Sequence, residues 1–451
     1  MLRRPLLFAL LLLCIPSLAL AQDHVMPHIL PMRERAEVID RWLEERLDMV
    51  LPDLMRREGI DMWIISAREY NEDPIIETML PATWLAARRR TVLVLFDRGT
   101  SAGVERLAVA RYNVGIFERA WSPEDQPDQW ARVAELIAER DPQRIGINRS
   151  DLFATADGLT DTEYDGLMGA LPEAYHDRLV SAERLSAGWL ETRTESEMHV
   201  YPQIMRIAHA IIAEGLSEQV IQPGVTTTTD VQWWYRERIR DLGLVTWFHP
   251  SVDVQRASTD ERGNDFSGRF SEATILPGDL LHIDFGITYL RLNTDTQQLA
   301  YVLRPGETDA PQGLKDALAV GNRLQDILTD QFVTDRSGNE ILLRALDQAT
   351  AEGIDATIYT HPIGYHGHGT GPTIGLWDQQ GGVPGRGDYP LYPNTAYSIE
   401  LNAAVGIPEW SGQRVRIMLE EDAFFDGETV RYIGGRQTQL MLLPRTSPVN
   451  R

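Results

Sequence analysis

Cysteine is almost missing from this chain of 451 residues, because the only one is Cys14, inside an N-terminal apolar stretch. Without that stretch the chain carries no thiol, which excludes disulfides, thiolate metal sites and cysteine nucleophiles together. Basic residues are also in deficit: 43 Lys and Arg face 66 Asp and Glu, for a formal net charge of −23. Such a surface repels phosphate backbones and anionic lipid headgroups, so neither nucleic acid nor a membrane surface is an expected partner.

Long apolar runs are confined to the N-terminus. Residues 6–20 are almost entirely apolar, follow Arg3 and Arg4, and end at the small-x-small site Ala19-Leu20-Ala21. This pattern predicts a cleaved signal peptide at residues 1–21, and therefore a periplasmic or secreted protein with no stable membrane insertion. The alternative is a retained anchor, but the run is short for a spanning helix.

The length of the chain exceeds one ordinary hydrophobic core, so two domains are expected after the signal peptide. Apolar residues at helical spacing predict a helix at residues 36–57, and a second helix is predicted at residues 129–140. Short apolar runs predict strands at residues 60–65, 91–96, 107–110 and 145–147. Strands interleaved with helices predict a three-layer α/β domain over residues 22–190, with its boundary within residues 185–195.

The second half of the chain has a different pattern. Helical spacing over residues 197–219 is followed by a break at Pro223-Gly224 and by a further helix introduced at residues 226–229. Short strands then alternate with turns rich in Gly, Pro and Asn, and residues 378–393 are predicted to be an irregular loop. The expected fold class is therefore α+β, with a β-rich site domain at residues 191–451.

Acidic residues interrupt the predicted strands of this second domain. The four acids are Asp284, Asp295, Glu400 and Glu420, and a glycine-rich segment adds His361, His366 and His368. Strand alternation places Asp284 on the face opposite Ile283 and Phe285. Ionised carboxylates are rarely buried unless they are paired or hold a metal, and few basic residues lie near these acids in sequence.

Four carboxylates and an imidazole, without any thiol, make a hard and oxygen-rich ligand set. Such a set suits Mn²⁺, with Zn²⁺, Fe²⁺ or Co²⁺ as alternatives. Because carboxylates can bridge, the set can hold two ions ~3.5–4 Å apart, the spacing that activates a water between them. Each position alone is a weak signal, since Asp at a strand end is commonly a turn or cap residue. The order and spacing of all five positions carry the prediction.

The ordered motifs resemble the pita-bread metallopeptidases, a family that includes methionine aminopeptidase, aminopeptidase P and prolidase. The matching motifs are Asp284-Phe285-Gly286, a second Asp eleven residues later, Gly367-His368-Gly369-Thr370-Gly371, Ser398-Ile399-Glu400 and Leu419-Glu420-Glu421-Asp422. The resemblance covers residues 195–444, and the part before it resembles the smaller α/β domain of aminopeptidase P, prolidase and creatinase. It implies a pita-bread catalytic domain after a three-layer domain, and a homodimer.

The resemblance also implies a role for each motif residue. The implied ligands of two divalent metal ions are Asp284, Asp295, His368, Glu400 and Glu420. Asp295 and Glu420 are the implied bridges, and Asp284 is implied to bind one ion bidentately while His368 binds the other. Glu400 is further implied as the general base for the attacking water.

The choice among the histidines depends on motif fit. His366-x-x-Gly369 and His368-x-x-Gly371 both match the family's pattern, but only His368 also has the preceding Gly. The sequence therefore favours His368 as the ligand.

Two positions depart from the family's pattern. The peptidases carry a His about seventeen residues before the first Asp and another seven residues after the ligand His, where this chain has Ser267 and Gly375. Those histidines contact the substrate. His249, His361 and His366 are the candidates to replace them, and His361 and His366 are the predicted catalytic partners of Glu400.

The predicted function is a dinuclear metal-dependent hydrolase, a Xaa-Pro aminopeptidase or dipeptidase that acts on peptides containing proline. The proline preference follows from the resemblance alone, because ligand spacing indicates only a metal and a hydrolytic water. Ser267 and Gly375 favour an alternative, a pita-bread enzyme acting on a non-peptide amide, ester or lyase substrate. A catalytically silent binding protein is a third hypothesis, which the retention of four uncompensated carboxylates disfavours.

Overall fold

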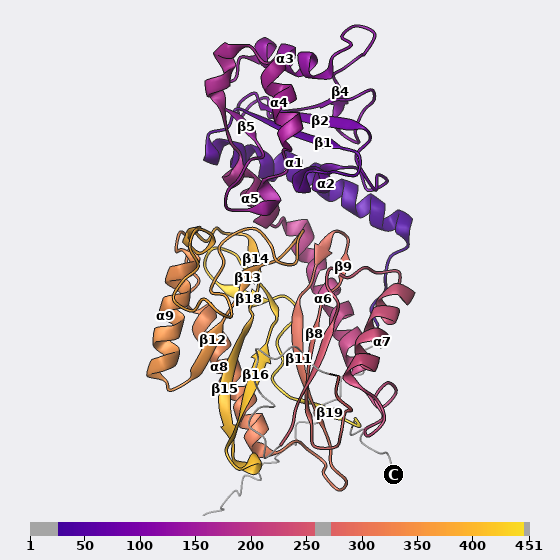
Figure 1. Cartoon of the computed structure of the whole chain (residues 1–451), viewed down its shortest axis with the longest axis vertical. Coiled ribbons are helices and arrows are strands. Elements are labelled where there is room, and N and C mark those ends of the chain that lie inside the picture. The colour runs from indigo at the N-terminus through magenta and orange to yellow at the C-terminus, as the bar shows by residue number, and fades with distance from the viewer. Residues whose placement is uncertain (1–25, 258–271, 446–451) are drawn as a thin grey trace, which may run out of the picture.

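The computed structural model describes residues 26–257 and 272–445, so the predicted signal peptide at residues 1–21 and Ser267 lie outside the described residues. Two units lie end to end along the long axis of the molecule, the first at the top of Figure 1 and the second below it. Among the described helices, none combines the length and the apolar character that crossing a bilayer requires.

The first unit is built on one mixed sheet with the strand order β4-β3-β2-β1-β5-β6. Its strands are β1 (Met62–Arg68), β2 (Arg90–Asp97), β3 (Val104–Val109), β4 (Glu118–Arg119), β5 (Ile145–Ile147) and β6 (Leu179–Ser181). Its helices are α1 (Met32–Glu58), α2 (Pro74–Met79), α3 (Gln129–Arg140), α4 (Asp161–Ala170) and α5 (Glu183–Glu191), with 3-10 turns at Ala154–Ala156 and Glu173–Arg178. The predicted helices and strands of this unit are present, with bounds that differ by a few residues.

Alternation along β1 explains the layers of the first unit. Trp63 and Ile65 point to a core shared with α1, α2 and α5, whereas Met62 and Ile64 point to a second core shared with α3 and α4. Since successive side chains of a strand face opposite sides, the apolar run of β1 needs helices on both faces. The three-layer α/β arrangement follows, as predicted.

The second unit consists of short curved sheets covered by helices. Its helices are α6 (Glu195–Gly215), α7 (Thr228–Asp241), α8 (Gln312–Thr329) and α9 (Gly338–Ala351), with 3-10 turns at Arg386–Asp388 and Pro408–Trp410. Its strands are β7 (Ser251–Gln255), β8 (Leu280–Phe285), β9 (Thr288–Tyr289), β10 (Leu292–Asn293), β11 (Thr296–Val302), β12 (Asp355–Ile358), β13 (His361–Pro362), β14 (Thr395–Ser398), β15 (Leu401–Ile407), β16 (Gln413–Leu419), β17 (Asp422–Phe425), β18 (Val430–Tyr432) and β19 (Met441–Leu443). The sheet orders are β19-β11-β8-β7, β12-β15-β16, β13-β14-β17-β18 and β10-β9.

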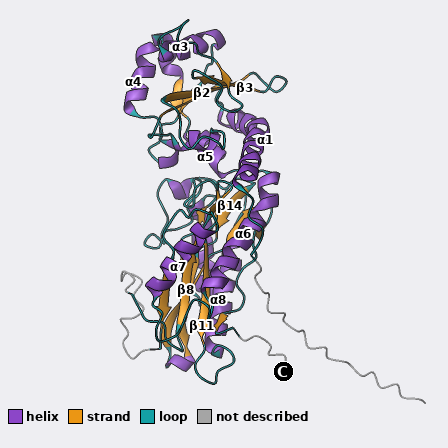
Figure 2. Ribbon diagram, turned by 90° about the vertical axis from the view of Figure 1, so that its right-hand side faces the viewer, coloured by secondary structure: helices purple, strands orange, loops and turns teal. Residues whose placement is uncertain are grey.

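Local sequence sets where the helices of this unit begin. Thr194, Thr227 and Ser337 each cap a helix and receive a reciprocal contact from the acidic residue three positions later, which completes a capping box. The apolar faces of α6 and α7 pack on β8, and those of α8 and α9 pack on β15 and β16. Figure 2 shows these helices lying along the outside of the strands.

A buried ion pair joins the two units. Arg46 of α1 contacts the carboxylate of Glu197 in α6 at 3.1 Å, and both side chains are fully buried. Arg46 also donates to the carbonyl of Thr192, and Arg193 lies 3.7 Å from Glu197. Because breaking one partner of such a network leaves a buried charge unpaired, these contacts hold the units in one arrangement.

Candidate metal centre

Strand pairing brings the four predicted acids together. Asp284 lies in β8, Asp295 directly precedes β11, Glu400 directly precedes β15 and Glu420 directly follows β16. The β8–β11 pair aligns Asp284 with Gln297, and the β15–β16 pair begins at Leu401 opposite Leu419, which sets Glu400 beside Glu420. An isolated bridge between Gln297 and Glu420 then joins the two strand pairs. Acids that lie up to 136 residues apart in the chain thus come together where the two strand pairs join.

The ligand atoms form three overlapping groups. Asp284, Asp295 and Glu420 place one oxygen each within 4.8 Å of the others. His361, Glu400 and Glu420 form a second group by the same measure. Asp295, His361 and His368 form the third, with Asp295 Oδ2 at 3.6 Å from His361 Nε2. Overlapping groups that share carboxylates are the arrangement that holds two cations ~3.5–4 Å apart.

Burial and mutual repulsion disfavour the ionised form of these acids, which a bound cation would reverse. Burial and then the charge of Glu420 raise the pKa of Asp284 to about 8, and the same two causes raise the pKa values of Asp295 and Glu400 well above their ordinary range. Within residues 26–257 and 272–445, no Lys or Arg forms an ion pair with any of the four acids. Asp284 Oδ1, Asp295 Oδ1 and His361 Nε2 are buried without a hydrogen-bond partner. An oxygen-rich set whose buried ligand atoms lack hydrogen-bond partners fits a pair of hard divalent ions.

Neighbouring polar groups hold the acids in place. Ser398 Oγ donates to Glu420 Oε1 at 2.6 Å, and Gln297 Nε2 donates to Glu400 Oε1 at 2.7 Å. Asp422 Oδ2 accepts from the backbone N–H of Asp295 at 3.3 Å. Such contacts orient metal ligands and leave their other oxygen free. Sequence reasoning missed Gln297, although its position two residues beyond Asp295 puts both on one face of the strand.

The structure places both His361 and His368 within ligand distance of Asp295, but only His361 also joins a group with Glu400 and Glu420. His361 lies in β13 opposite Ser398, and its Nε2 is 3.5 Å from Glu420 Oε1 and 3.9 Å from Glu400 Oε2. Its Nδ1 lies 3.0 Å from the carbonyl of Pro362, so a proton on Nδ1 leaves a lone pair on Nε2 directed at the acids. The geometry therefore favours His361 as the ligand, whereas motif fit favoured His368.

The physical reason lies in the strand pairing of the glycine-rich segment. His361-Pro362-Ile363-Gly364 also reads His-x-x-Gly, and only the β13–β14 pairing distinguishes it from the two later matches. With His361 as the ligand, the histidine seven residues later is His368 itself. Its ring lies 4.7 Å from the ring of His361 and 5.1 Å from that of Trp247, measured between centroids.

With His361 as the ligand, Gly375 is not the position where the family has its second histidine, and the local backbone requires a glycine there. Its φ is +77°, and a Cβ there would lie 2.2 Å from the carbonyl oxygen of Ile358. A side chain at this position clashes with the backbone, whatever its chemistry.

The other two histidines lie outside the ligand groups. His366 lines a cavity beside His368, and burial lowers its pKa below the ordinary value. His249 contacts Arg236 Nη1 at 3.1 Å and lies against the ring of Trp233. The structure therefore brings His361 and His368 to the acids, His366 to the adjoining cavity, and His249 to the surface near α7.

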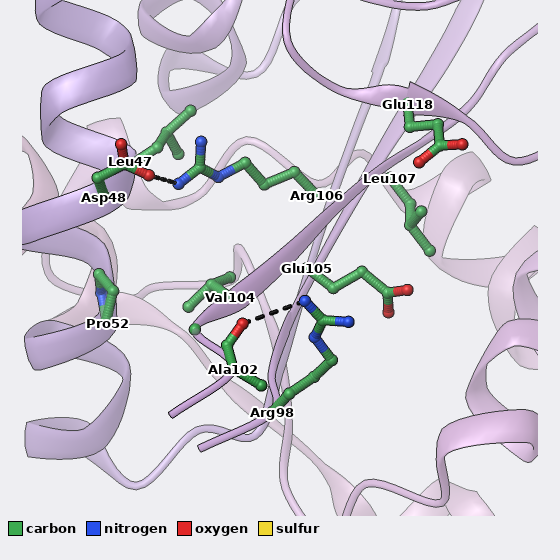
Figure 3. Close-up of a pocket in the computed structure, with 11 residues that line it drawn as sticks. Leu47, Asp48, Pro52, Arg98, Ala102, Val104, Glu105, Arg106, Leu107 and Glu118 are labelled. Carbon is green, nitrogen blue, oxygen red and sulfur yellow. Dashed lines mark hydrogen bonds and ion pairs between the residues drawn. The ribbon is translucent and has the colours of Figure 1, made fainter. Parts of the chain in front are cut away.

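A separate cavity of about 400 Å³ lies in the first unit, between α1 and β3 (Figure 3). Four of its five charged side chains have partners, and the fifth, Glu118, is exposed. Arg106 pairs with Asp48, Arg98 Nη2 donates to the carbonyl of Ala102 at 3.1 Å, and Glu105 pairs with Arg140. This cavity therefore offers no group prepared for chemistry.

Comparison with known proteins agrees with this site. Residues 203–423 match the model of metallopeptidase family M24. The predicted resemblance to the pita-bread metallopeptidases, and with it the predicted class of enzyme, is confirmed. No curated protein sequence matches the chain.

Solved structures share the whole two-unit fold. An X-Pro aminopeptidase from Thermotoga maritima MSB8 superposes with a TM-score of 0.60 at 16% identity, covering 86% of this chain and 99% of that one. A Xaa-Pro dipeptidase from Bacillus anthracis gives 0.55 at 18% identity, covering 92% and 100%. Aminopeptidase P from E. coli, with the inhibitor Pro-Leu, gives 0.56 at 12% identity, covering 89% and 96%. At these identities the likeness establishes the fold: a pita-bread unit preceded by an α/β unit, as predicted.

Proposed function

We propose that this protein is a dinuclear metallopeptidase that cleaves the bond between an N-terminal residue and proline, with Mn²⁺ as the preferred ion. The observation that carries the proposal is the set of three overlapping ligand groups, linked by Glu420 and Asp295, with no Lys or Arg among the described residues paired with their acids. Two solved proteins with this fold are named for X-Pro or Xaa-Pro cleavage, which supports the proline preference.

The ligand set could hold two ions. Asp284 would hold one, His361 and Glu400 would hold the other, and Asp295 and Glu420 lie in reach of both. When bound, the two ions supply the positive charge that the acids lack, polarise the substrate carbonyl and lower the pKa of water.

Glu400 has the geometry of a general base. Gln297 occupies its Oε1, so its Oε2, on the side of His361, is the oxygen that takes the proton of the attacking water. Tyr359 N–H and Thr360 Oγ1 donate to the backbone carbonyl of Glu400, and Thr360 Oγ1 accepts from its N–H. These contacts fix the backbone from which the carboxylate extends.

His368 has the geometry of a hydrogen-bond donor to the substrate. Burial, and then the neighbouring His361, lower the pKa of His368 to about 4, so its ring is neutral at pH 7. It is more exposed than His361 and stands at the mouth of the cavity that adjoins the acids. A neutral imidazole N–H there donates to the oxygen that becomes negative when water attacks the carbonyl.

The alternative of a non-peptide substrate was based on Ser267 and Gly375, which stand where the family has two substrate histidines. With His361 as the ligand, His368 stands seven residues later, where the second of these histidines is expected, so Gly375 no longer favours a non-peptide substrate. Ser267 lies outside the described residues.

Activity on defined peptides tests the proposal. The purified protein loaded with Mn²⁺ should cleave Ala-Pro or Ala-Pro-Ala, should not cleave Ala-Ala-Ala at a comparable rate, and should lose activity on chelation. Glu400→Gln should keep bound metal and lower kcat by ~10²–10⁴-fold, because the amide cannot accept the proton. Absence of cleavage of both proline peptides by protein that holds two ions per chain would refute the proposal.

We further propose that the chain is exported, on the strength of its N-terminal sequence. The mature N-terminus should be Gln22 when the full chain is expressed in a bacterium with a secretion pathway. N-terminal sequencing that finds Met1 on the cytosolic protein would contradict export.

A further inference from the structure

Three neighbouring strands behind the candidate metal centre carry a polar side chain each on the same face. Strand pairing sets Asp253 of β7 directly opposite His282 of β8, and it aligns Gln297 of β11 with Asp284, two residues beyond His282. The ribbons of β8 and β11 run side by side in Figure 1. The residues next to Asp253 and His282 in their strands are apolar and point to the core on the opposite face, as strand alternation requires.

The contacts of these side chains lead step by step to Glu400. Asp253 Oδ2 lies 3.6 Å from His282 Nδ1, and neither atom has a hydrogen-bond partner within the described part of the chain. On the other side of the ring, His282 Nε2 lies 2.9 Å from Gln297 Oε1. Gln297 Nε2 then donates to Glu400 Oε1 at 2.7 Å. The two middle members, His282 and Gln297, are buried.

Donor and acceptor chemistry allows only one orientation of the Gln297 amide. An ionised Glu400 carboxylate only accepts hydrogen bonds, so the NH₂ group of Gln297 must face it and the amide oxygen must face His282. Because an amide oxygen also only accepts, the hydrogen in that contact is on His282 Nε2. The backbone of Gln297 is fixed as well, since its N–H donates to the carbonyl of Glu420 at 3.0 Å. The imidazole therefore selects the amide orientation that donates to Glu400.

Packing alone does not explain polar residues at positions 282 and 297. Leu280 and Leu299 lie on the same face of β8 and β11 and are buried in the core that contains α8, so this face accepts apolar side chains. A buried polar side chain costs free energy unless it is hydrogen-bonded, and an apolar residue avoids that cost. The contact with Glu400 is what His282 and Gln297 provide and an apolar pair would not.

We propose that His282, held by Asp253, acts through the Gln297 amide to position the carboxylate of Glu400 for proton transfer. The inference rests on the proposed function, in which Glu400 is the general base, and adds two positioning residues to it. A carboxylate held at Oε1 cannot rotate, so its Oε2 stays directed at the attacking water. Outer contacts of this kind orient a ligand that also takes part in the chemistry, and a small misalignment of the base lowers the rate.

The test uses variants that remove or keep the hydrogen-bond donor at position 282. His282→Leu removes it, whereas His282→Gln keeps an N–H donor near the place of Nε2. His282→Asn replaces His282→Leu if the latter does not fold, because its shorter amide reaches the side of Asp253 but not Gln297. Gln297→Leu and the double variant with His282→Leu complete the set. The matched control is Val252→Ala, which weakens the same sheet from its opposite face, next to Asp253.

At saturating Mn²⁺, His282→Leu should lower kcat for Ala-Pro by about 10- to 100-fold with little change in KM. His282→Gln should recover most of this loss, and Val252→Ala should lower Tm but keep the wild-type kcat. The double variant should be no slower than Gln297→Leu alone, because residues that act as a unit are not additive.

Two results would overturn the inference while the peptidase function stands. Losses that multiply in the double variant would show that His282 acts independently of Gln297. A wild-type kcat in His282→Leu would show that the imidazole does not position the base.

Mn²⁺ affinity, measured by calorimetric titration, separates failure of the inference from failure of the function. Because Glu400 also lies in a ligand group, a misplaced carboxylate should weaken Mn²⁺ binding to His282→Leu by about 10-fold. His282→Gln and Val252→Ala should bind Mn²⁺ as the wild type does. If the wild type hydrolyses neither proline peptide, weaker binding in His282→Leu alone still supports the role of His282. Equal affinity in all variants refutes it, whatever the activity.

Discussion

At the scale of single residues, the two histidines of the site have separable roles. His361 directs Nε2 into the carboxylates, whereas His368 faces the cavity. His361→Ala should therefore lower the metal content measured by elemental analysis, with partial recovery in excess Mn²⁺. His368→Ala should keep the wild-type metal content and lower kcat by about 10²-fold, as expected for a lost hydrogen bond or proton-transfer contact.

The opposite pattern would restore the assignment that motif fit favours. Metal loss in His368→Ala with full occupancy in His361→Ala would make His368 the ligand. His366→Ala is the control for the segment, because His366 lies outside all three ligand groups and the variant should keep the metal content unchanged.

The buried acids predict how pH acts on the metal-free protein. Folding raises the pKa of Asp284 from an ordinary 3.8 to about 8, so between these values the folded chain binds more protons than the unfolded chain. The free energy of unfolding of the metal-free protein should therefore fall as pH rises from about 4 to about 8. Bound metal keeps the acids ionised in the folded state, so the free energy of unfolding of the metal-loaded protein should not fall with pH in this way.

Thermal unfolding scans across this pH range, with and without chelator, measure the effect. The difference in Tm between metal-loaded and metal-free protein should widen as pH rises. Parallel curves would contradict the idea that these acids repel one another in the absence of metal.

At the scale of elements, the hairpin between β8 and β11 carries two of the ligands and depends on Gly286. A Cβ at Gly286 would lie 2.4 Å from the carbonyl oxygen of Thr294, which accepts a hydrogen bond from Trp247 Nε1. Gly286→Ala should therefore destabilise the fold by about 1–3 kcal/mol and weaken metal binding, although it removes no ligand. Urea unfolding and metal titration measure the two effects.

Gly169 provides the matched control for this substitution. It lies exposed in α4, and a Cβ there meets nothing within 4 Å. Gly169→Ala should raise stability by up to ~1 kcal/mol, because alanine has the higher helix propensity. Equal stability of Gly286→Ala and wild type would show that the hairpin tolerates a side chain at this point.

At the scale of the whole molecule, the tryptophans nearest the predicted irregular loop and the predicted domain boundary differ sharply in exposure. Trp377, directly before the loop, is 59% exposed, whereas Trp189 in α5 is fully buried. Of these two sites, limited chymotrypsin digestion should therefore cut after Trp377 and spare residues 185–195. Early cutting after Trp189 would mean that the junction of the units opens more readily than the loop.

Local patterns were sufficient to predict most of the elements and all four acids. The helix at residues 129–140 and the strand at residues 145–147 have the bounds that periodicity predicts, because apolar spacing reflects the layers on which each element packs. The acids are recognisable for a related reason: each one interrupts an apolar strand, where a charge is costly unless it serves a site.

Only the tertiary structure decided how the histidines meet the acids and what lies beside them. His361, His366 and His368 all stand in one glycine-rich segment, and the pairing of β13 with β14, more than thirty residues further along the chain, brings His361 next to Glu400 and Glu420. The cavity between the units depends on α2, which lies far earlier in the chain than the other residues that line it. Spacing in sequence reports what one strand or helix presents on each face, whereas contacts between distant strands and units arise only when their buried surfaces pack together.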